Sequence, residues 1–329
     1  MAALTYGDIT PRTAAYAATR MLTRAFPALC MAKFGQMQSV PKGKSKTVTW
    51  RRYNKIAVAT AALTEGVTPS ATSITNTDVS KTLAQYGDRA QITDVILDTH
   101  EDPILSEFSD ILGEAAGETK ETLVYNAIKG GTQKVWANGV AARNLVVTAM
   151  SANDVRNGIR QLKRQNAVPI TSMLGASTGV GTLPIPPCYV CFIHPDIERD
   201  LQAITGYIRV QNYGTWKPLG DNEVGSFENV RFLSSTLCAA EPNAGGAKGL
   251  MISTGGVSAD VYLSLMVAKD AYATVALAGA ESITPMVVNP KPSDSDPLGQ
   301  RGHIAYKFYH AAAILNDAFM TRLETAATA

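Results

Sequence analysis

Residues 296–316, "DPLGQRGHIAYKFYHAAAILN", form the most strand-like segment of the chain, although they stand close to its end. A Pro/Gly turn opens the stretch. Alternating apolar residues follow, as in a strand with one buried face, and the run then becomes almost wholly apolar. His303 and His310 lie in it without a nearby Ser or Cys nucleophile. The pattern therefore predicts a structural strand, added last to a sheet built from earlier residues.

Size and composition fit a globular protein of one large domain or two to three lobes. The chain has 329 residues, of which 46% are hydrophobic and 18% charged. Residues 261–280 are the longest apolar run, but Lys269 and Asp270 interrupt it, so we expect no membrane span. No secretory signal is visible at the start. Four cysteines do not make a disulfide framework, which indicates folding in a reducing cytoplasm.

The net charge of +2 conceals an uneven distribution. Residues 1–60 contain ten Lys and Arg residues and one acidic residue, a net charge of +9. The remainder contains 20 basic and 27 acidic residues, a net charge of −7. This division predicts a basic arm that binds something acidic, either nucleic acid or the acidic part of another copy of the chain.

The first third of the chain predicts an arm followed by a long hairpin. Residues 11–34 are rich in Ala and favour a helix that is broken near Pro27. Strand-like runs then lie at 47–53 and 78–93, on either side of a low-charge stretch of Thr, Ser and Ala. Such a hairpin is too thin to have a core of its own. It needs a partner surface to become ordered.

Residues 102–129 give the clearest helix signal, with Asp102 as N-cap, Pro103 at the first helical position and Gly130 after the end. Ile104, Phe108, Ile111 and Ala115 mark an apolar stripe at helical spacing. Five acids share another face: Glu107, Asp110, Glu114, Glu118 and Glu121. This face is either a solvated helix surface or a surface whose mutual repulsion is relieved by a basic partner.

The second half of the chain reads as an αβ lobe. A helix is expected at 153–166 and, after a Gly/Pro loop, a short helix at 195–204. Strands are expected at 188–194, 229–235, 249–254 and 270–277. A Pro-rich crossing at 284–299 then leads back to the terminal strand.

Chemical motifs are weak throughout. Lys44 and Ser45 follow Gly43 as in a phosphate-binding loop, but the required earlier glycine is Gln38. Cys188, Cys191 and His194 are the one metal-like group. Residues three apart on a strand point to opposite faces and a second ligand pair is missing, so buried core cysteines are the favoured interpretation. We therefore expect no enzyme, no catalytic or metal-binding residues and no cofactor.

Taken in order, these elements resemble the major capsid proteins of tailed bacteriophages, whose fold is named after phage Hong Kong ninety-seven, and more closely those of N-four-like podophages. The resemblance lies in four stretches: TYGDITPRTAAYAA near the start, LTEGVTP at 63–69, QYGDRAQITDVILDTHEDP at 85–103, and DPLGQRGHIAYKFYHAAAILNDAFMTRLE at 296–324. Residues 150–285 match the family in the pattern of their elements more than in the identity of their residues. None of these stretches is a chemical motif, so the resemblance depends on their order and joint presence.

The resemblance implies an α+β fold with five parts. They are an N-terminal arm (1–35), an extended β-hairpin loop lying over a neighbouring subunit (36–93), a peripheral domain with a long spine helix and a β-sheet (94–150), an αβ axial domain (151–285), and return strands that complete the peripheral domain (286–329). Within the last part, residues 302–323 close the peripheral sheet, with a bend at Asn316. The implied function is that of a structural protein which self-assembles through pentamers and hexamers into an icosahedral shell around double-stranded DNA.

The uneven charge then suggests a contact between subunits. We hypothesise that five basic residues on the loop of one subunit dock against the five acids of the spine helix on a neighbouring subunit. The basic residues are Lys42, Lys44, Lys46, Arg51 and Arg52. Alternatively, the basic arm faces packaged DNA and makes weak, non-specific contact with phosphate. Further expected partners are a portal protein and separate scaffolding or decoration proteins, with assembly in the bacterial host cytoplasm, incorporation into the virion and no membrane contact.

Other classes of protein stay open from the sequence alone. An encapsulin-like compartment would share the fold and enclose a cargo enzyme in place of DNA. A small zinc-dependent αβ protein would use Cys188, Cys191 and His194. A generic two-lobed binding protein would be monomeric.

Overall fold

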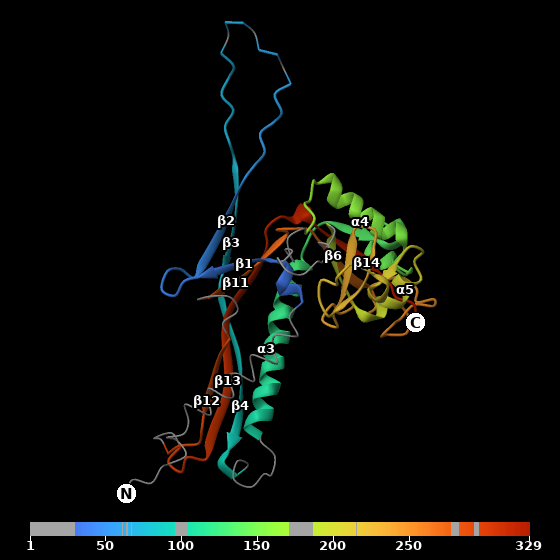
Figure 1. Cartoon of the computed structure of the whole chain (residues 1–329). Helices are drawn as coiled ribbons and strands as arrows, with labels where there is room; N and C mark the ends of the chain where they lie inside the picture. The colour runs from blue at the N-terminus through green and yellow to red at the C-terminus, as the bar shows by residue number, and fades with distance from the viewer. Residues whose placement is uncertain are drawn as a thin grey trace.

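A computed structural model describes residues 30–60, 62–63, 65–66, 68–95, 104–170, 187–214, 216–277, 283–292 and 296–329. The expected helical arm at 11–34 lies mostly outside these residues, as do Asp102 and Pro103. The described chain forms an elongated lobe and a rounder lobe, each around its own sheet, and a thin hairpin that projects away from both (Figure 1). None of the helices in the described ranges is both long and apolar enough to cross a membrane.

The elongated lobe is built on one long strand, β13 (Arg301–Ile314). Strand β4 (Ala84–Thr93) pairs antiparallel along one side of it. On the other side β12 (Thr284–Val288) and then β11 (Tyr272–Leu277) pair with successive parts of β13, also antiparallel. Strand β1 (Gln36–Val40) adds to β11 in parallel and completes a five-stranded sheet. The late strand that the sequence predicts is therefore the centre of this sheet.

Helix α3 (Ile104–Ile128) lies along β13 and covers one face of the sheet (Figure 1). Its Leu112 and Ala116 pack against Ile304, Tyr306 and Phe308, which alternate along β13 on the buried face. The alternation in the sequence thus corresponds to burial against the helix.

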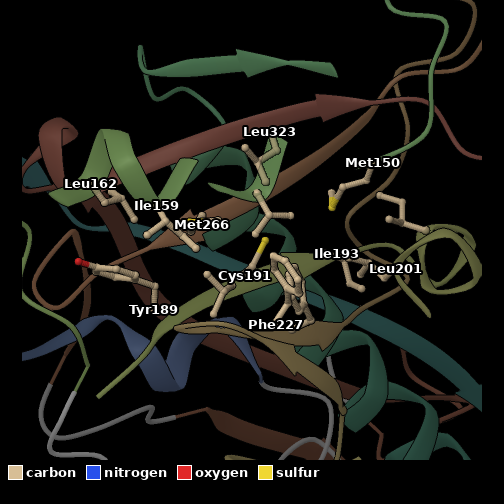
Figure 2. Close-up of a cluster of buried hydrophobic side chains, with 14 of the residues drawn as sticks. Met150, Ile159, Leu162, Tyr189, Cys191, Ile193, Leu201, Phe227, Met266 and Leu323 are labelled. Carbon is tan, nitrogen blue, oxygen red and sulfur yellow. The ribbon is translucent and has the colours of Figure 1, made fainter. Parts of the chain in front are cut away.

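The rounder lobe contains a seven-stranded sheet in the order β5-β14-β10-β6-β9-β8-β7. Helix α4 (Ala152–Arg164) packs on it through Val155, Ile159 and Leu162, and Figure 2 shows this cluster with Tyr189, Met266 and Leu323 of the sheet. A capping box starts the helix, since Ser151 Oγ accepts a hydrogen bond from Asp154 N and Ser151 N donates to the Asp154 carboxylate. The strands are β5 (Lys134–Trp136), β6 (Tyr189–Ile193), β7 (Ile208–Arg209), β8 (Glu223–Phe227), β9 (Val230–Ser234), β10 (Tyr262–Val267) and β14 (Met320–Thr325).

Short helical turns connect these elements. They are η3 (Met31–Phe34), η4 (Ala137–Gly139), η5 (Arg143–Leu145), η6 (Pro195–Ile197), α5 (Glu198–Gln202), η7 (Val210–Asn212) and η8 (Asp317–Phe319).

One buried cluster joins the two lobes. Met31 and Phe34 of η3 meet Val124 and Ile128 of α3 in this cluster, together with side chains from β6, β10, β11 and β13. The Tyr272 hydroxyl donates a hydrogen bond to the backbone oxygen of Met31, and a Cβ on Gly35 would come within 2.6 Å of the Tyr272 ring. Only glycine therefore allows the chain to pass this closely beneath the ring.

The projecting hairpin pairs β2 (Thr47–Tyr53) with β3 (Asn76–Thr82) in antiparallel register. Leu83 separates β3 from β4, is almost completely buried, and donates its backbone N–H to Lys46 O at 2.9 Å. Two separate strands thus occupy the run predicted at 78–93. The first belongs to the hairpin and the second to the sheet.

Several segments belong to a different sheet from the one predicted. Strands β1 and β4, expected in the hairpin, and β11, expected in the αβ lobe, all join the five-stranded sheet, as does β12, where a Pro-rich crossing was expected. Strand β5 belongs to the seven-stranded sheet, and so does β14, which was expected to close the sheet of β13. At η8 the chain turns, with Asn316 as N-cap, and passes from one sheet to the other. Residues 249–254 form a single bridge, Met251 with Thr328, and no strand.

Because β14 supplies Leu323 to the core of the rounder lobe, shortening that side chain should destabilise the subunit. Leu323 is fully buried between α4 and the sheet, so we expect Leu323→Ala to lower the free energy of unfolding by about 2–5 kcal/mol. Urea unfolding of the unassembled chain measures the change. Leu250→Ala is the matched control: Leu250 is 80% exposed, and a change within about 0.5 kcal/mol is expected. Equal losses in both variants would contradict this assignment of the core.

Candidate interaction surface

Three of the predicted basic residues form one exposed turn. Lys42, Lys44 and Lys46 lie between β1 and β2, and we call residues 41–46 the lysine turn. Gly43 has φ +76°, the left-handed conformation that favours glycine. Ser45 Oγ accepts a hydrogen bond from Thr47 N at 3.0 Å, which fixes the end of the turn. The sequence therefore brings three ammonium groups together on a defined backbone.

The two predicted arginines behave differently from the lysines. Arg51 on β2 forms a bidentate pair with Asp78 on β3, with Nε–Oδ1 at 2.9 Å and Nη2–Oδ2 at 2.8 Å. The hydrogen bonds from Arg51 hold the pKa of Asp78 at about 2. Arg51 thus pairs within its own hairpin, in contrast to the predicted contact with a neighbour. Arg52 is exposed and lines a cavity of about 300 Å³ at the base of the hairpin, beside Trp50 and Phe319.

The predicted acidic face of α3 is not a continuous surface. Glu114 and Glu118 are exposed, but Asp110 is only 7% and Glu121 only 1% exposed. The Glu107 side chain lies outside the described residues. Ile111, predicted on the apolar stripe, is 55% exposed. The prediction of a five-acid face is therefore wrong for Asp110 and Glu121, because the buried arc of α3 is rotated away from the predicted apolar stripe and includes these two acids.

Glu121 holds the chain that precedes η3. Cys30 donates to it twice, from Sγ to Oε1 at 2.7 Å and from the backbone N to Oε2 at 3.3 Å. Burial raises the pKa of Glu121, and these hydrogen bonds oppose the shift only in part. This acid therefore serves to anchor the arm on the spine helix.

A second group of acids lies where α3 faces the rounder lobe. Glu118, Glu198 and Asp221 line a cavity of about 470 Å³, which we call the acidic cleft. Glu223 also lines it, but its carboxylate is occupied by Arg231 Nη1 at 3.0 Å and the Tyr213 hydroxyl at 2.5 Å. Sequence reasoning missed Glu198 and Asp221 because they come from separate elements that only the fold brings to Glu118.

Beyond its paired strands the hairpin carries exposed apolar side chains. In the described part of residues 54–75 the four large ones are 45–79% exposed: Ile56, Val58, Leu63 and Ile74. Figure 1 shows this segment well away from both lobes. It contributes nothing to the buried clusters of the described chain.

The cysteines have the character of core residues. Cys188, Cys191 and Cys238 are buried, and burial raises the pKa of the Cys188 thiol to about 11. His194 accepts the backbone N–H of Asp196 on Nδ1 at 3.2 Å. Across the described ranges no three metal-binding side chains gather into a site.

Comparison with known proteins gives both a family and a fold. A sequence model described as phage capsid protein matches residues 76–323. No curated protein sequence matches the chain. Among solved structures, the capsid of cyanophage P-SCSP1u has a TM-score of 0.58 and 15% identity, covering 90% of this chain and 87% of that one. The capsid of Ralstonia phage GP4 has a TM-score of 0.61 and 11% identity, covering 89% of this chain and 87% of that one. The capsid of cyanophage Pam1 has a TM-score of 0.56 and 13% identity, covering 93% of each chain.

The raised pKa of Glu121 predicts how stability depends on pH. Glu121 favours the folded state in its protonated form. This stabilisation is fully present below the pKa of Glu in the unfolded chain, about 4.5, and it is lost as pH rises through the higher pKa of Glu121 in the folded chain. We therefore expect Glu121→Gln to remove part of the decline in unfolding free energy above pH 4.5. Urea unfolding between pH 4 and 8 tests this. Glu118→Gln, an exposed acid on the same helix, should follow the wild-type profile. Parallel profiles for wild type and Glu121→Gln would contradict the prediction.

Proposed function

The chain belongs to the phage capsid protein family, and we propose that its copies assemble through pentamers and hexamers into an icosahedral shell around phage double-stranded DNA. It is a structural major capsid protein, with the fold of tailed-phage capsids, and a component of the virion. We name the elongated lobe with α3 the peripheral domain and the rounder lobe the axial domain. The closer likeness to N-four-like podophages stays a prediction.

The hairpin is the observation that supports assembly best. Burying one Leu, Ile or Val side chain contributes about 1.5–3 kcal/mol, and Ile56, Val58, Leu63 and Ile74, which are 45–79% exposed, gain only part of this within the subunit. An isolated two-stranded hairpin is marginal in water. A neighbouring copy that covers these side chains would supply both the burial and the order. The hairpin is thus the proposed extended loop that lies over an adjacent subunit.

Charge supports a second contact between neighbours. The lysine turn lies on one side of the hairpin, and the axial domain with α4 and α5 lies on the other (Figure 1). The acidic cleft opens between α3 and the axial domain. Two complementary patches at different places on one subunit make a head-to-tail contact, which generates rings where the rotation closes. We propose that the lysine turn of one copy docks at the acidic cleft of the next.

Each exposed ion pair in this contact contributes at most about 1 kcal/mol, so its main effect is on encounter and register. Exposed basic residues can also make weak contact with packaged DNA without excluding the contact between the lysine turn and the acidic cleft. The DNA contact is weak because a near-neutral chain releases few counterions from DNA on binding. Portal, scaffolding and decoration proteins, and assembly in the host cytoplasm, belong to the same proposal.

Reversing the lysine turn tests the electrostatic contact and, through its wild-type arm, the function. Wild type should form closed particles containing nucleic acid in negative-stain images of infected or co-expressing cells. The triple variant Lys42→Glu, Lys44→Glu, Lys46→Glu should assemble at least about tenfold more slowly, because like charges then meet at the cleft. Light scattering measures assembly, and circular dichroism verifies that the subunit is folded.

The matched control reverses three exposed residues of α4: Arg160, Lys163 and Arg164. It changes the net charge equally, away from the proposed contact, and should assemble at the wild-type rate. Normal assembly of the lysine-turn variant would overturn the docking contact. Particles with protein cargo and no DNA would overturn the enclosure of a genome.

Polar replacement of the hairpin side chains tests its apolar contact. We expect the triple variant Val58→Ser, Leu63→Ser, Ile74→Ser to keep the wild-type unfolding free energy within about 1 kcal/mol, since these residues are exposed in the subunit, yet to form no stable particles. Size-exclusion chromatography with light scattering measures the oligomers. The conservative variant Val58→Ile, Leu63→Met, Ile74→Val should assemble. Particles of normal stability from the serine variant would contradict the role of the hairpin.

A further inference from the structure

A cavity of about 240 Å³ lies in the peripheral domain between α3 and the corner where β1, β11 and β13 meet. Met37, Val275 and Ala276 provide apolar walls. Lys120 of α3, Thr274 of β11 and His310 of β13 provide polar groups, and all three are more than nine-tenths buried. The volume is several times that of one water molecule.

His310 is the unusual residue of this cavity. It is 1% exposed, and neither Nδ1 nor Nε2 has a hydrogen-bond partner among the described residues. Its backbone pairs with both β4 and β11, so the residue is fixed in the middle of the sheet. Its ring meets that of Phe308 edge-on at 6.3 Å. A buried polar group without a partner loses its hydrogen bonds to water and gains none in return, a loss that an apolar side chain at this position would avoid.

Lys120 is the cationic side chain among the residues that line the cavity. The Lys120 ammonium group lies close enough to lower the pKa of His310, although burial is the larger cause, and that pKa falls to about 4. An anion in the cavity would meet the positive potential of Lys120, one imidazole N–H and the Thr274 hydroxyl. The imidazole N–H, the Thr274 hydroxyl and the Lys120 ammonium group can pair with both oxygens of a carboxylate, and Gln38 and Ser39 also line the cavity.

We propose that this cavity binds a carboxylate group, held by His310 and Thr274 in the field of Lys120. The carboxylate comes either from a small free acid or from an Asp or Glu side chain of a second copy, and only the latter source rests on the proposed function. Occupancy would satisfy His310 and fasten β1, β11 and β13 to the spine helix.

Histidine NMR tests the proposal directly, because the chain has only four histidines. The full chain, unassembled and labelled on its imidazole rings, is titrated with sodium acetate at constant ionic strength with sodium chloride. We expect the His310 resonances to shift with saturation and the pKa of His310 to rise, since a carboxylate favours the protonated ring. His100→Gln, His194→Gln and His303→Gln assign the other three signals and leave that of His310.

Two variants measure the contribution of the cavity walls. Lys120→Met and Thr274→Val keep the shape of the side chains approximately, and each should weaken acetate binding about tenfold or more. If Lys120→Met does not fold, the weaker acetate binding expected of Thr274→Val is the measurement that tests the cavity walls.

Assembled particles distinguish the two sources. A His310 shift that appears on assembly, without acetate, and that acetate does not increase indicates an acidic side chain of a neighbouring copy. A saturable acetate shift in both the unassembled chain and the assembled particles indicates a free acid, and the shift in the unassembled chain supports the cavity even if assembly fails. If neither acetate nor assembly moves the His310 signals, the cavity contains only water and the proposal is overturned.

Discussion

Backbone pairing of β13 is the constraint on which the rest of the structure depends. A single strand of 14 residues pairs with β4 on one side and with β12 and β11 on the other, so segments from three distant parts of the sequence share one ladder. Gly87 shows how close this pairing is, because a Cβ there would lie 2.4 Å from the backbone oxygen of Tyr306. The same chain then turns at η8 and supplies β14 to the second sheet. Two sheets are thereby tied by one continuous segment, and their relative position follows from covalent geometry as well as packing.

The junction beside this segment converts the connection into a rigid one. Side chains from η3, α3, β6, β10, β11 and β13 share one buried cluster, so neither lobe has a complete core at this boundary without the other. Polar groups at its edge are satisfied individually: Cys30 by Glu121, and Glu324 by Arg143 at 2.8 and 2.9 Å and Arg322 at 2.8 Å. Removing one member of such a buried set leaves its partner unpaired, which costs more than the hydrogen bond itself. Stiffness at the junction is what a shell subunit needs, since its shape sets the angle to its neighbours.

The sequence predicts the periodic elements well and their partners poorly. Strand β13 follows from alternation, and α3 ends at Ile128, just before Gly130, as the glycine signal indicates. The acidic face fails for a geometric reason. Each helical residue turns by about 100°, which places Asp110 and Glu121 on the same side as Gly113, Gly117 and Val124, and all of these are buried. Similarly, the pairing of Arg51 with Asp78 depends on hairpin register, and the acidic cleft depends on three separate elements. The hydrophobic period of an element can be read from its local sequence. Which of its faces is buried, and how its strands align with their partners, depend on the whole fold.

These features separate the stability of the subunit from its capacity to assemble. The cores of both lobes are internal and the junction is closed, so the described body has what a folded domain requires. The hairpin has its backbone pairing and a few side-chain contacts: threonine and serine hydroxyl pairs, hydrogen bonds of Asn54 with Thr75 and Thr77, one exposed ion pair, and a small apolar contact of Val48 and Trp50 at its base. Cross-strand pairs of this kind contribute a few tenths of a kcal/mol each, too little to order the segment beyond Tyr53. Its apolar side chains therefore have no function within one copy, and their exposure is explained when a second copy covers them.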